Sequence, residues 1–596
     1  MQGLTRAGRT GARRVAIAGA TLALGGGLAG ALAPGAGAHD GHGHRSGHGE
    51  RHHHHGRPRH RGHGRSFPGH PGGGTPATAV PDSYTTSDLG TLAVDPEHGI
   101  LANDAGGPTQ LISHTDPSHG SLTLDPDGSF HYVPELGFTG DDSFTYTIPN
   151  AVSLFTDNLP PLGTFGGVSI NAGGYGSSVA PVPGHPDEFY GLTDRGPNVS
   201  APDGNDVLPI PSFDPAIGKF LMGPDGQAIL LRKIPLQDSS GHPFSGLVNS
   251  GNATGETMEN LQGHVLANDP DGYDPEGLVA MRDGTFWVSD EYGPYITRFS
   301  ADGRQLQRLS PLDGSLPREL VNRVPNKGME GLTITPDGST LVGLMQSALQ
   351  QKDLGTVKAT TLAPTRIVTY NLHTHATHEY LYLLHNPATN GTANSEITAL
   401  SDHTFLVDER DGKFPGPTAF KQLWKIDLDS ATDVGPSAHV KDASYDSAHG
   451  GLLIGGTQGG TGKTIEGLTS GEDTAQAAAT LTQAHIAPVS ETQFLDVDKL
   501  LLSLDPTAAF FDHDKIEGVA TTDGGRHLWI SNDSDFGIAG VTNTAAPWQL
   551  ESKIDPASGL QDNGEYLEVD MSRVDPTTSA AGTSTATVTI HVGPGQ

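Results

Sequence analysis

The sequence predicts an all-β protein in which a β-propeller of six blades, or alternatively seven, follows a smaller Ig-like β-sandwich. The first observation is a repeated pattern: an acid opens a strand, usually before Gly, and a second apolar strand then ends in acids. Copies begin at Glu276-Gly277, Glu330-Gly331, Glu396-Ile397 and Glu517-Gly518. In three copies Asp-Gly separates the two strands, which favours a tight hairpin turn. The 81 Gly and 43 Pro among 596 residues are also typical of turn-rich β structure. Radial repetition of small sheets makes a propeller.

The spacing of the repeats gives the expected blade count. The interval from Glu396 to Glu517 is about twice the two before it, which indicates two blades. An earlier blade is expected at 178–194, so six blades is the first expectation and seven the rival. Because the repeat puts a carboxylate at one point of several blades, we expect these acids to converge near the central channel.

Residues 1–38 have the features of a signal peptide. Arginines precede an apolar run at 15–32, and Ala36-Gly37-Ala38 offers a small-residue cleavage site. Arg13-Arg14 leaves the twin-arginine route open beside the general secretory route. We expect a secreted or extracellular protein, and no other stretch is long and apolar enough to span a bilayer.

Residues 39–78 are rich in His, Gly and Arg and are expected to be a disordered linker. Such a composition cannot build a core. The alternative is capture of transition metals by its imidazoles, which include His52 to His55.

Residues 79–149 predict a compact β-sandwich, because aromatics alternate with polar residues in its expected strands at 129–134 and 142–147. The run at 99–104, followed by 119–124 and 140–146, resembles the bacterial cadherin-like, Ig-like repeat. The resemblance implies a spacer or adhesion role and attachment at the cell surface.

The propeller is assigned to residues 160–572 and a C-terminal tail to 573–596. Gly-, Thr- and Ser-rich insertions at 205–265 and 450–490 are expected as loops on one rim, with a short helix at 475–484.

Charge limits the partners. Ten of the 35 Lys and Arg residues, but only two of the 68 acids, lie in the first 75 residues, so the rest of the chain is more acidic than the formal net charge of −33 suggests. Such a body is not expected to bind nucleic acid or an anionic membrane. Calcium is a natural counterion for clustered carboxylates. The chain has no Cys, so disulfides cannot stabilise it. No oligomerisation signal is visible, and a monomer is expected.

An ordered series of motifs runs from the first expected blade to the last. It comprises Phe165-Gly166-Gly167, Thr193-Asp194-Arg195-Gly196-Pro197-Asn198, Asp274-Pro275-Glu276-Gly277, Ser289-Asp290-Glu291-Tyr292-Gly293-Pro294, Asn326-Lys327-Gly328-Met329-Glu330-Gly331, Met345-Gln346-Ser347, Glu409-Arg410-Asp411, Asp514-Lys515-Ile516-Glu517-Gly518 and Ser531-Asn532-Asp533-Ser534-Asp535. Across roughly 165–545 the chain resembles the phytase-like family described by "esterase-like activity of phytase". The resemblance implies a phosphoric-ester hydrolase.

The acids of these motifs are oxygen ligands of the kind that calcium takes. The candidate metal ligands are Glu276, Glu330, Glu517, Asp194, Asp290, Glu291, Glu409, Asp533 and Asp535. The candidate catalytic residues are Glu330, Arg195, Arg410 and Lys515, whose cations would hold phosphate. The competing interpretation is that these acids and bases pair with one another and tie neighbouring blades together.

Two functions follow from these observations. The first is a secreted, calcium-dependent phosphoesterase that hydrolyses small phosphorylated compounds through metal-activated water. The alternative is a non-catalytic, calcium-stabilised propeller that acts as an extracellular binding or adhesion module. A serine esterase is not supported, because the chain contains no Gly-x-Ser-x-Gly motif.

Overall fold

The structure is a computed structural model that describes residues 77–106, 110–251, 255–456 and 461–595. The predicted signal peptide and nearly all of the predicted His-rich linker lie outside the described residues. The described part is mostly β structure, with a few short helices.

The N-terminal sandwich consists of two sheets, with strand orders β1-β36-β6-β3 and β2-β5-β4. The strands are β1 (Asp82–Ser87), β2 (Leu92–Val94), β3 (Ser113–His114), β4 (Gly120–Leu124), β5 (Phe130–Pro134), β6 (Gly140–Pro149) and β36 (Thr583–Gly593). Its core buries the alternating aromatics Phe130, Tyr132, Phe144 and Tyr146. This confirms the Ig-like sandwich that the alternation predicts.

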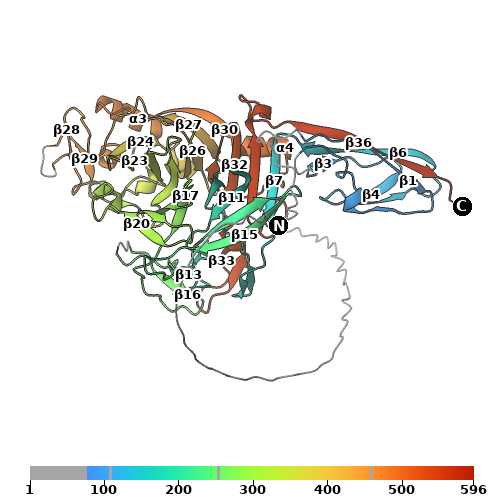
Figure 1. Cartoon of the computed structure of the whole chain (residues 1–596), viewed down its shortest axis with the longest axis horizontal. Coiled ribbons are helices and arrows are strands. Elements are labelled where there is room, and N and C mark those ends of the chain that lie inside the picture. The colour runs from blue at the N-terminus through green and yellow to red at the C-terminus, as the bar shows by residue number, and fades with distance from the viewer. Residues whose placement is uncertain (1–76, 107–109, 252–254, 457–460, 596) are drawn as a thin grey trace, which may run out of the picture. The chain divides into compact units, whose positions relative to one another are not determined.

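The C-terminal segment corrects one expectation. Residues 573–596 were expected to be a tail, but β36 lies between β1, which it pairs in parallel, and β6, which it pairs antiparallel (Figure 1). Val588 and Ile590 of β36 are fully buried in the core of the sandwich. The last strand of the chain therefore completes the domain that opens the described residues.

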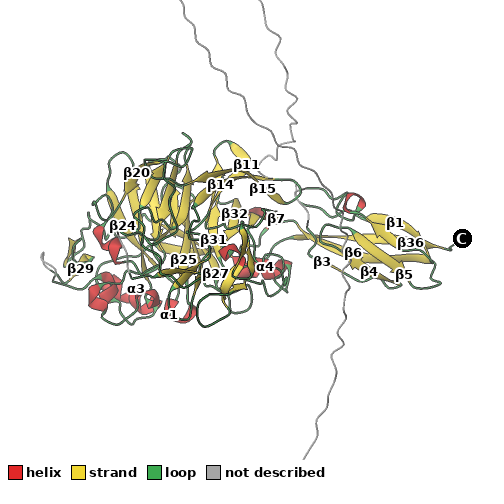
Figure 2. Ribbon diagram, turned by 90° about the horizontal axis from the view of Figure 1, so that it is seen from below, coloured by secondary structure: helices red, strands yellow, loops and turns green. Residues whose placement is uncertain are grey.

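Most of the remaining described strands, which are drawn in yellow in Figure 2, form five four-stranded units. Three of these units are separate sheets, and the other two are joined into one eight-stranded sheet by the parallel pairing of their outermost strands. In order from the inner strand outward the five units are β10 (Ser178–Val182), β11 (His185–Leu192), β14 (Ala216–Met222) and β15 (Gln227–Pro235); β17 (Pro275–Ala280), β18 (Phe286–Asp290), β19 (Ile296–Phe299) and β20 (Gln305–Leu309); β21 (Met329–Ile334), β22 (Thr340–Met345), β23 (Pro364–Asn371) and β24 (Thr377–Leu383); β25 (Ala393–Ala399), β26 (Thr404–Arg410), β27 (Lys421–Asp427) and β30 (Ser490–Asp496); and β31 (Ile516–Ala520), β32 (His527–Asn532), β35 (Glu565–Asp570) and β7 (Val152–Asp157).

The inner strands of these units form a closed ring. β10 lies beside β17, β17 beside β21, β21 beside β25, β25 beside β31, and β31 again beside β10. This is the architecture of a β-propeller. The last unit takes its outermost strand, β7, from the N-terminal side of the propeller, so the two ends of the propeller chain share one sheet.

The topology counts five blades among the described residues, where the sequence predicts six or seven. The two long intervals between repeats, which were predicted to hold additional blades, contain insertions instead. The first holds a separate sheet of β12 (Val199–Ser200), β13 (Asp206–Leu208) and β16 (Met258–Asn260). The second holds the hairpin of β28 (Ala443–Asp446) and β29 (Gly451–Ile454), with the helices α2 (Ile465–Leu468) and α3 (Thr474–Gln483). Chain length alone does not distinguish an insertion from a blade.

The repeated Gly has a packing reason. A Cβ on it would lie 2.5–2.7 Å from a backbone nitrogen of the next inner strand, a distance that real Cβ atoms do not reach. The three contacts are Gly277 with Leu332, Gly331 with Ile397, and Gly518 with Val179. The glycine therefore permits the close approach of neighbouring inner strands that closes the ring.

The repeated acid also has a backbone reason for its position. The register of the inner strand against its partner shifts at this point in four blades, which marks a β-bulge. The shifts lie between Pro275 and Leu278, Met329 and Gly331, Asn394 and Glu396, and Ile516 and Val519. A bulge changes the direction of the side chain that it carries.

Candidate functional site

The predicted convergence of acids is present at one end of the propeller channel. A cavity of about 230 Å³ is lined there almost wholly by charged and amide side chains. The lining residues are Asp194, Arg195, Asn198, Asp274, Glu276, Glu291, Asn326, Lys327, Glu330, Gln346, Arg410, Lys515, Glu517, Asp533 and Asp535. We call this space the channel cavity.

Three glutamates from three blades form the centre of the channel cavity. Glu276, Glu330 and Glu517 each place a carboxylate oxygen within 4.8 Å of the other two, and all three side chains are buried. Glu276 also belongs to a second group of the same kind with Asp274 and Glu291. These five carboxylates therefore form one continuous buried cluster.

Burial and mutual repulsion disfavour the charged form of this cluster. Burial, followed by the charges of Glu330 and Asp274, raises the pKa of Glu276 well above its usual range. Burial raises the pKa of Asp274 to about 8, although Arg195 opposes the shift. Burial likewise raises the pKa of Glu517 to about 7 against the influence of Arg410. A cation among these groups would relieve the same repulsion.

The donor atoms fit a metal ion. Oxygen Oε2 of Glu330 is buried and accepts no hydrogen bond, a state that costs free energy unless a cation or proton meets it. The three-glutamate group offers only carboxylate oxygens, which are ligands for hard divalent cations. The buried acidic clusters can thus hold a metal ion.

An amide and a lysine fix the orientation of Glu330. Gln346 Nε2 donates a hydrogen bond to Glu330 Oε1, and Lys327 Nζ donates one to Gln346 Oε1. The other glutamate oxygen, Oε2, is thereby left as the one without a hydrogen bond. The sequence places Gln346 and Lys327 in motifs of the series but does not predict a site role for either.

The three predicted cations of the site line the channel cavity and contact acids. Arg195 lies 3.5 Å from Glu256 and 3.8 Å from Asp274. Arg410 forms an ion pair with Glu517. Lys515 forms its ion pairs with Asp533, at 2.8 Å, and with Asp535. The predicted acids Asp533 and Asp535 are therefore placed as counterions of a lysine, and Asp194 lines the wall.

Two predicted ligands do not line the channel cavity. Asp290 accepts backbone hydrogen bonds from Asp274 N, at 2.8 Å, and from Gly293 N. Glu409 accepts from the Tyr382 hydroxyl at 2.7 Å and contacts the His385 ring at 2.7 Å. Both carboxylates stabilise the blade structure behind the cavity.

Four further lining residues, Asp274, Asn198, Lys327 and Gln346, belong to the motif series of the family resemblance but were not among the predicted ligands or catalytic residues. Asp274 stands two residues before Glu276 in a motif already noted, and side chains two apart in extended chain share a face. Gln346 follows β22 at the place where acids end the corresponding strand of another blade. The sequence repeat is therefore sufficient to predict Asp274 and Gln346 as candidate site residues.

Two family models match parts of the chain. Residues 170–482 match the model of the family described as "Esterase-like activity of phytase". The chain belongs to this phytase-like family. Residues 74–156 match the bacterial Ig domain, which confirms the second resemblance.

One curated relative of this phytase-like chain is an "Uncharacterized secreted protein" of Arthroderma benhamiae. It is 30% identical over an alignment of 282 residues, and the match covers 38% of this chain and 54% of the relative. The chain thus spans about half the length of the curated relative it matches.

Solved structures similar to the phytase-like chain include hydrazine synthase of Kuenenia stuttgartiensis, at 10% identity over 80% of this chain and 97% of that one, with a TM-score of 0.23. They also include the Cps50 (Swd1) β-propeller domain of Myceliophteria thermophila, at 8% identity over 78% and 99%, with a TM-score of 0.21. Virginiamycin B lyase of Staphylococcus aureus matches at 12% identity over 64% and 99%, with a TM-score of 0.21. Scores this low carry no argument, so the propeller assignment rests on the sheet topology.

Within the described ranges of the phytase-like chain, no helix has the length and apolar character needed to cross a bilayer.

Proposed function

We propose that this protein is a secreted, calcium-dependent phosphoesterase that hydrolyses small phosphorylated compounds. The observation that carries the proposal is the channel cavity, where a buried carboxylate cluster with an unpartnered oxygen faces arginine and lysine side chains. Membership of the phytase-like family and the secreted relative support it.

Calcium would be held by Glu276, Glu330 and Glu517, with Asp274 and Glu291 beside them. Bound there, calcium would supply a Lewis acid for a phosphoryl oxygen and a means of activating water. Calcium is favoured over softer metals because this group offers only oxygen donors.

The residues of the chain would bind and orient the phosphate. Arg195 and Arg410 present guanidinium groups that suit two-point contact with phosphate. Lys327 binds an amide rather than a carboxylate in this structure, so its charge is available for an anionic substrate. The carboxylate cluster would repel the same anion, and the proposal therefore requires the cation.

A second function is favoured by one specific observation. Arg195, Arg410 and Lys515 all contact carboxylates, which is the arrangement of a network that holds blades together. In this alternative, calcium locks the propeller, and the protein is a non-catalytic extracellular binding or adhesion module.

An assay of phosphate release distinguishes the phosphoesterase from the non-catalytic binding module. The substrates are p-nitrophenyl phosphate and phytate, each measured with calcium and with EGTA. We expect calcium-dependent release that falls about 100-fold or more in Glu330→Gln, the range for loss of a group that assists proton transfer or charge stabilisation. The matched control is Glu396→Gln, at the same repeat position. Both Glu396 oxygens already accept hydrogen bonds, at 2.6 Å from Ser178 and 3.0 Å from Leu332, so this variant should retain activity.

The absence of hydrolysis would favour the alternative function. If neither substrate is hydrolysed at any calcium concentration while calcium still raises the melting temperature, the binding module is the correct function.

A further inference from the structure

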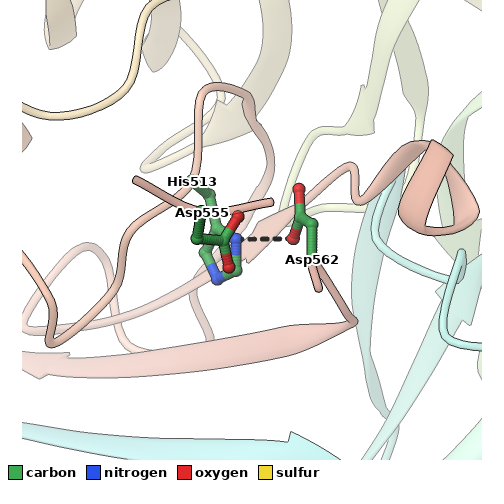
Figure 3. Close-up of side chains that lie close together, drawn as sticks. All are labelled: His513, Asp555 and Asp562. Atoms are coloured by element: carbon green, nitrogen blue, oxygen red, sulfur yellow. Dashed lines mark hydrogen bonds and ion pairs between the residues drawn. The ribbon is translucent and has the colours of Figure 1, made fainter. Parts of the chain in front are cut away.

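We propose that His513, Asp555 and Asp562 bind a divalent transition-metal ion of the zinc class at a second site (Figure 3). None of the three lines the channel cavity. The inference does not depend on the proposed function.

The three side chains come from two segments next to the last blade. His513 precedes β31, and Asp555 and Asp562 lie between β34 (Leu550–Ser552) and β35. One ligand atom of each lies within 4.8 Å of the other two, and all three residues are at most 6% exposed. In the close-up a dashed line joins the Asp562 carboxylate to a nitrogen of the His513 ring, and the Asp555 side chain overlaps the ring in this view (Figure 3).

The contacts of the imidazole single out Nδ1 as the nitrogen that would bind a metal, in exchange for its present contacts with Asp562 and Asn532. Nε2 of His513 lies 3.0 Å from Glu565 Oε2, so a proton on Nε2 is held by that carboxylate. This is the outer partner that metal-binding histidines usually have, and it leaves the lone pair on Nδ1. Nδ1 lies 2.9 Å from Asp562 Oδ1. Two ligand atoms each about 2.1 Å from a tetrahedral zinc ion are separated by about 3.4 Å, so Nδ1 and the carboxylate oxygen would move apart by about 0.5 Å when the ion binds.

The side-chain amide of Asn532 contacts both His513 and Asp562. Its oxygen accepts from Glu565 N at 2.8 Å, which fixes the orientation of the amide. Its nitrogen lies 2.9 Å from Asn563 O, 3.2 Å from Asp562 Oδ1 and 3.0 Å from His513 Nδ1. Asn532 therefore positions the carboxylate and ring without adding an anion.

A separate observation points to a missing ligand. Oxygen Oδ1 of Asp555 is buried and accepts no hydrogen bond, and the side chain faces the histidine and Asp562. Such a group costs free energy unless a cation meets it. Lys553 does not supply that cation, because its Nζ is already within 2.9 Å of Asp514, Asp535 and Asp562.

The site is also accessible to an ion. His513 and Asp555 line a cavity of about 750 Å³, together with the carboxylates of Asp512 and Glu565. A metal site needs such an entry path.

The donor set selects the class of metal. One imidazole nitrogen with carboxylate oxygens favours zinc and similar divalent ions over calcium, which takes oxygen ligands. The channel cavity and the His513 site are thus expected to differ in metal, with calcium in the channel cavity and zinc at the His513 site.

Titration of the metal-stripped full chain with zinc chloride tests the site. Asp555→Asn keeps the shape of the side chain and should bind one zinc ion fewer per chain than the wild type, measured by calorimetry and elemental analysis. The second variant is His513→Gln, and its matched control is His527→Gln. His527 also contacts two carboxylates, Asp523 at 2.6 Å and Asp570 at 3.9 Å, but belongs to no three-residue metal group among the described residues. The His-rich N-terminal stretch is common to all variants and cancels in the differences.

Zinc should raise the melting temperature of the wild type and His527→Gln but not of Asp555→Asn, and equal calcium should not replace it. An unchanged zinc count in Asp555→Asn would overturn the proposal, as would equal binding of calcium at this site. Should the variants fail to fold, anomalous diffraction at the zinc edge from wild-type crystals soaked in zinc decides: density between the three side chains supports the site, and its absence rejects it.

Discussion

Arg410 donates a hydrogen bond from Nη2 to Oε1 of Glu517, across the boundary between two blades of the propeller. The same guanidinium donates from Nε to Ser395 Oγ at 3.0 Å, so it is held on both sides. A residue expected to bind phosphate thus contacts a residue expected to bind metal. In the proposed calcium-bound state, calcium would compete with Arg410 for the charge of Glu517, and metal binding would release the arginine toward an anionic substrate.

Removal of the arginine should destabilise the protein. Arg410→Gln leaves Glu517 buried without its cation, and breaking such a pair costs about 3 kcal/mol or more in free energy of unfolding. Urea unfolding in EGTA measures this cost. The double variant Arg410→Gln, Glu517→Gln should recover most of it, because no unpaired charge remains; a double variant as unstable as Arg410→Gln alone would contradict the pairing.

Removal of one carboxylate should have the opposite effect without calcium. Glu276 is buried among like charges, so Glu276→Gln should raise the melting temperature in EGTA and reduce the further rise on adding calcium. Differential scanning calorimetry in both buffers measures the two shifts. Glu551→Gln, at an exposed glutamate, is the control and should change neither. A destabilised Glu276→Gln in EGTA would show that the cluster does not repel itself.

The contact between His385 and Glu409 predicts a pH dependence of stability. Burial lowers the pKa of His385, but the hydrogen bonds to Glu409 and Glu491 outweigh it and raise the pKa from 6.5 to about 10. A raised histidine pKa contributes stability that is complete below pH 6.5 and is lost as the pH rises through about 10.

His385→Gln should therefore lower the free energy of unfolding by about 1.5–3 kcal/mol at pH 6, the range for a hydrogen bond to a charged group, and by less at pH 10. Urea unfolding of both proteins at the two pH values measures the gap. His403→Gln removes a histidine from an exposed pair with Asp429 and should leave the stability nearly unchanged at either pH. A gap that widens toward pH 10 would refute the assignment.

The C-terminal strand should be essential to the sandwich. Ile590 of β36 is fully buried, and Ile590→Asp places a charge in that core. Limited proteolysis should then cleave within 77–149 while the propeller stays resistant. His591→Gln, on the exposed side of the same strand, should behave as the wild type apart from the loss of its contact with Asp141.

The sequence predicted those site residues whose position is set by the repeat itself. Glu276, Glu330 and Glu517 share a bulge and a following strand, so their convergence follows from the repeat. The sequence did not separate Asp290, the last residue of β18, from Glu291, which directly follows the strand: only Glu291 lines the channel cavity. Which of two adjacent acids faces a cavity depends on local backbone direction that the pattern does not encode.

Other features depend on contacts between distant parts of the chain. The pairing of β36 with β1 joins residues about 500 positions apart, and no local pattern identifies such a partner. The His513 site likewise combines residues that no motif groups together, and only the fold brings Asp555 beside the ring.

The most direct test of the central claim compares calcium binding with phosphate release in the wild type. The free calcium concentration that half-saturates the channel cavity by calorimetry should equal the concentration that gives the half-maximal rate of phosphate release, and Glu276→Gln should lose both. Phosphate release that persists unchanged in EGTA, or calcium binding at this cavity without any release, would contradict the proposal that these buried carboxylates form a calcium-dependent catalytic site.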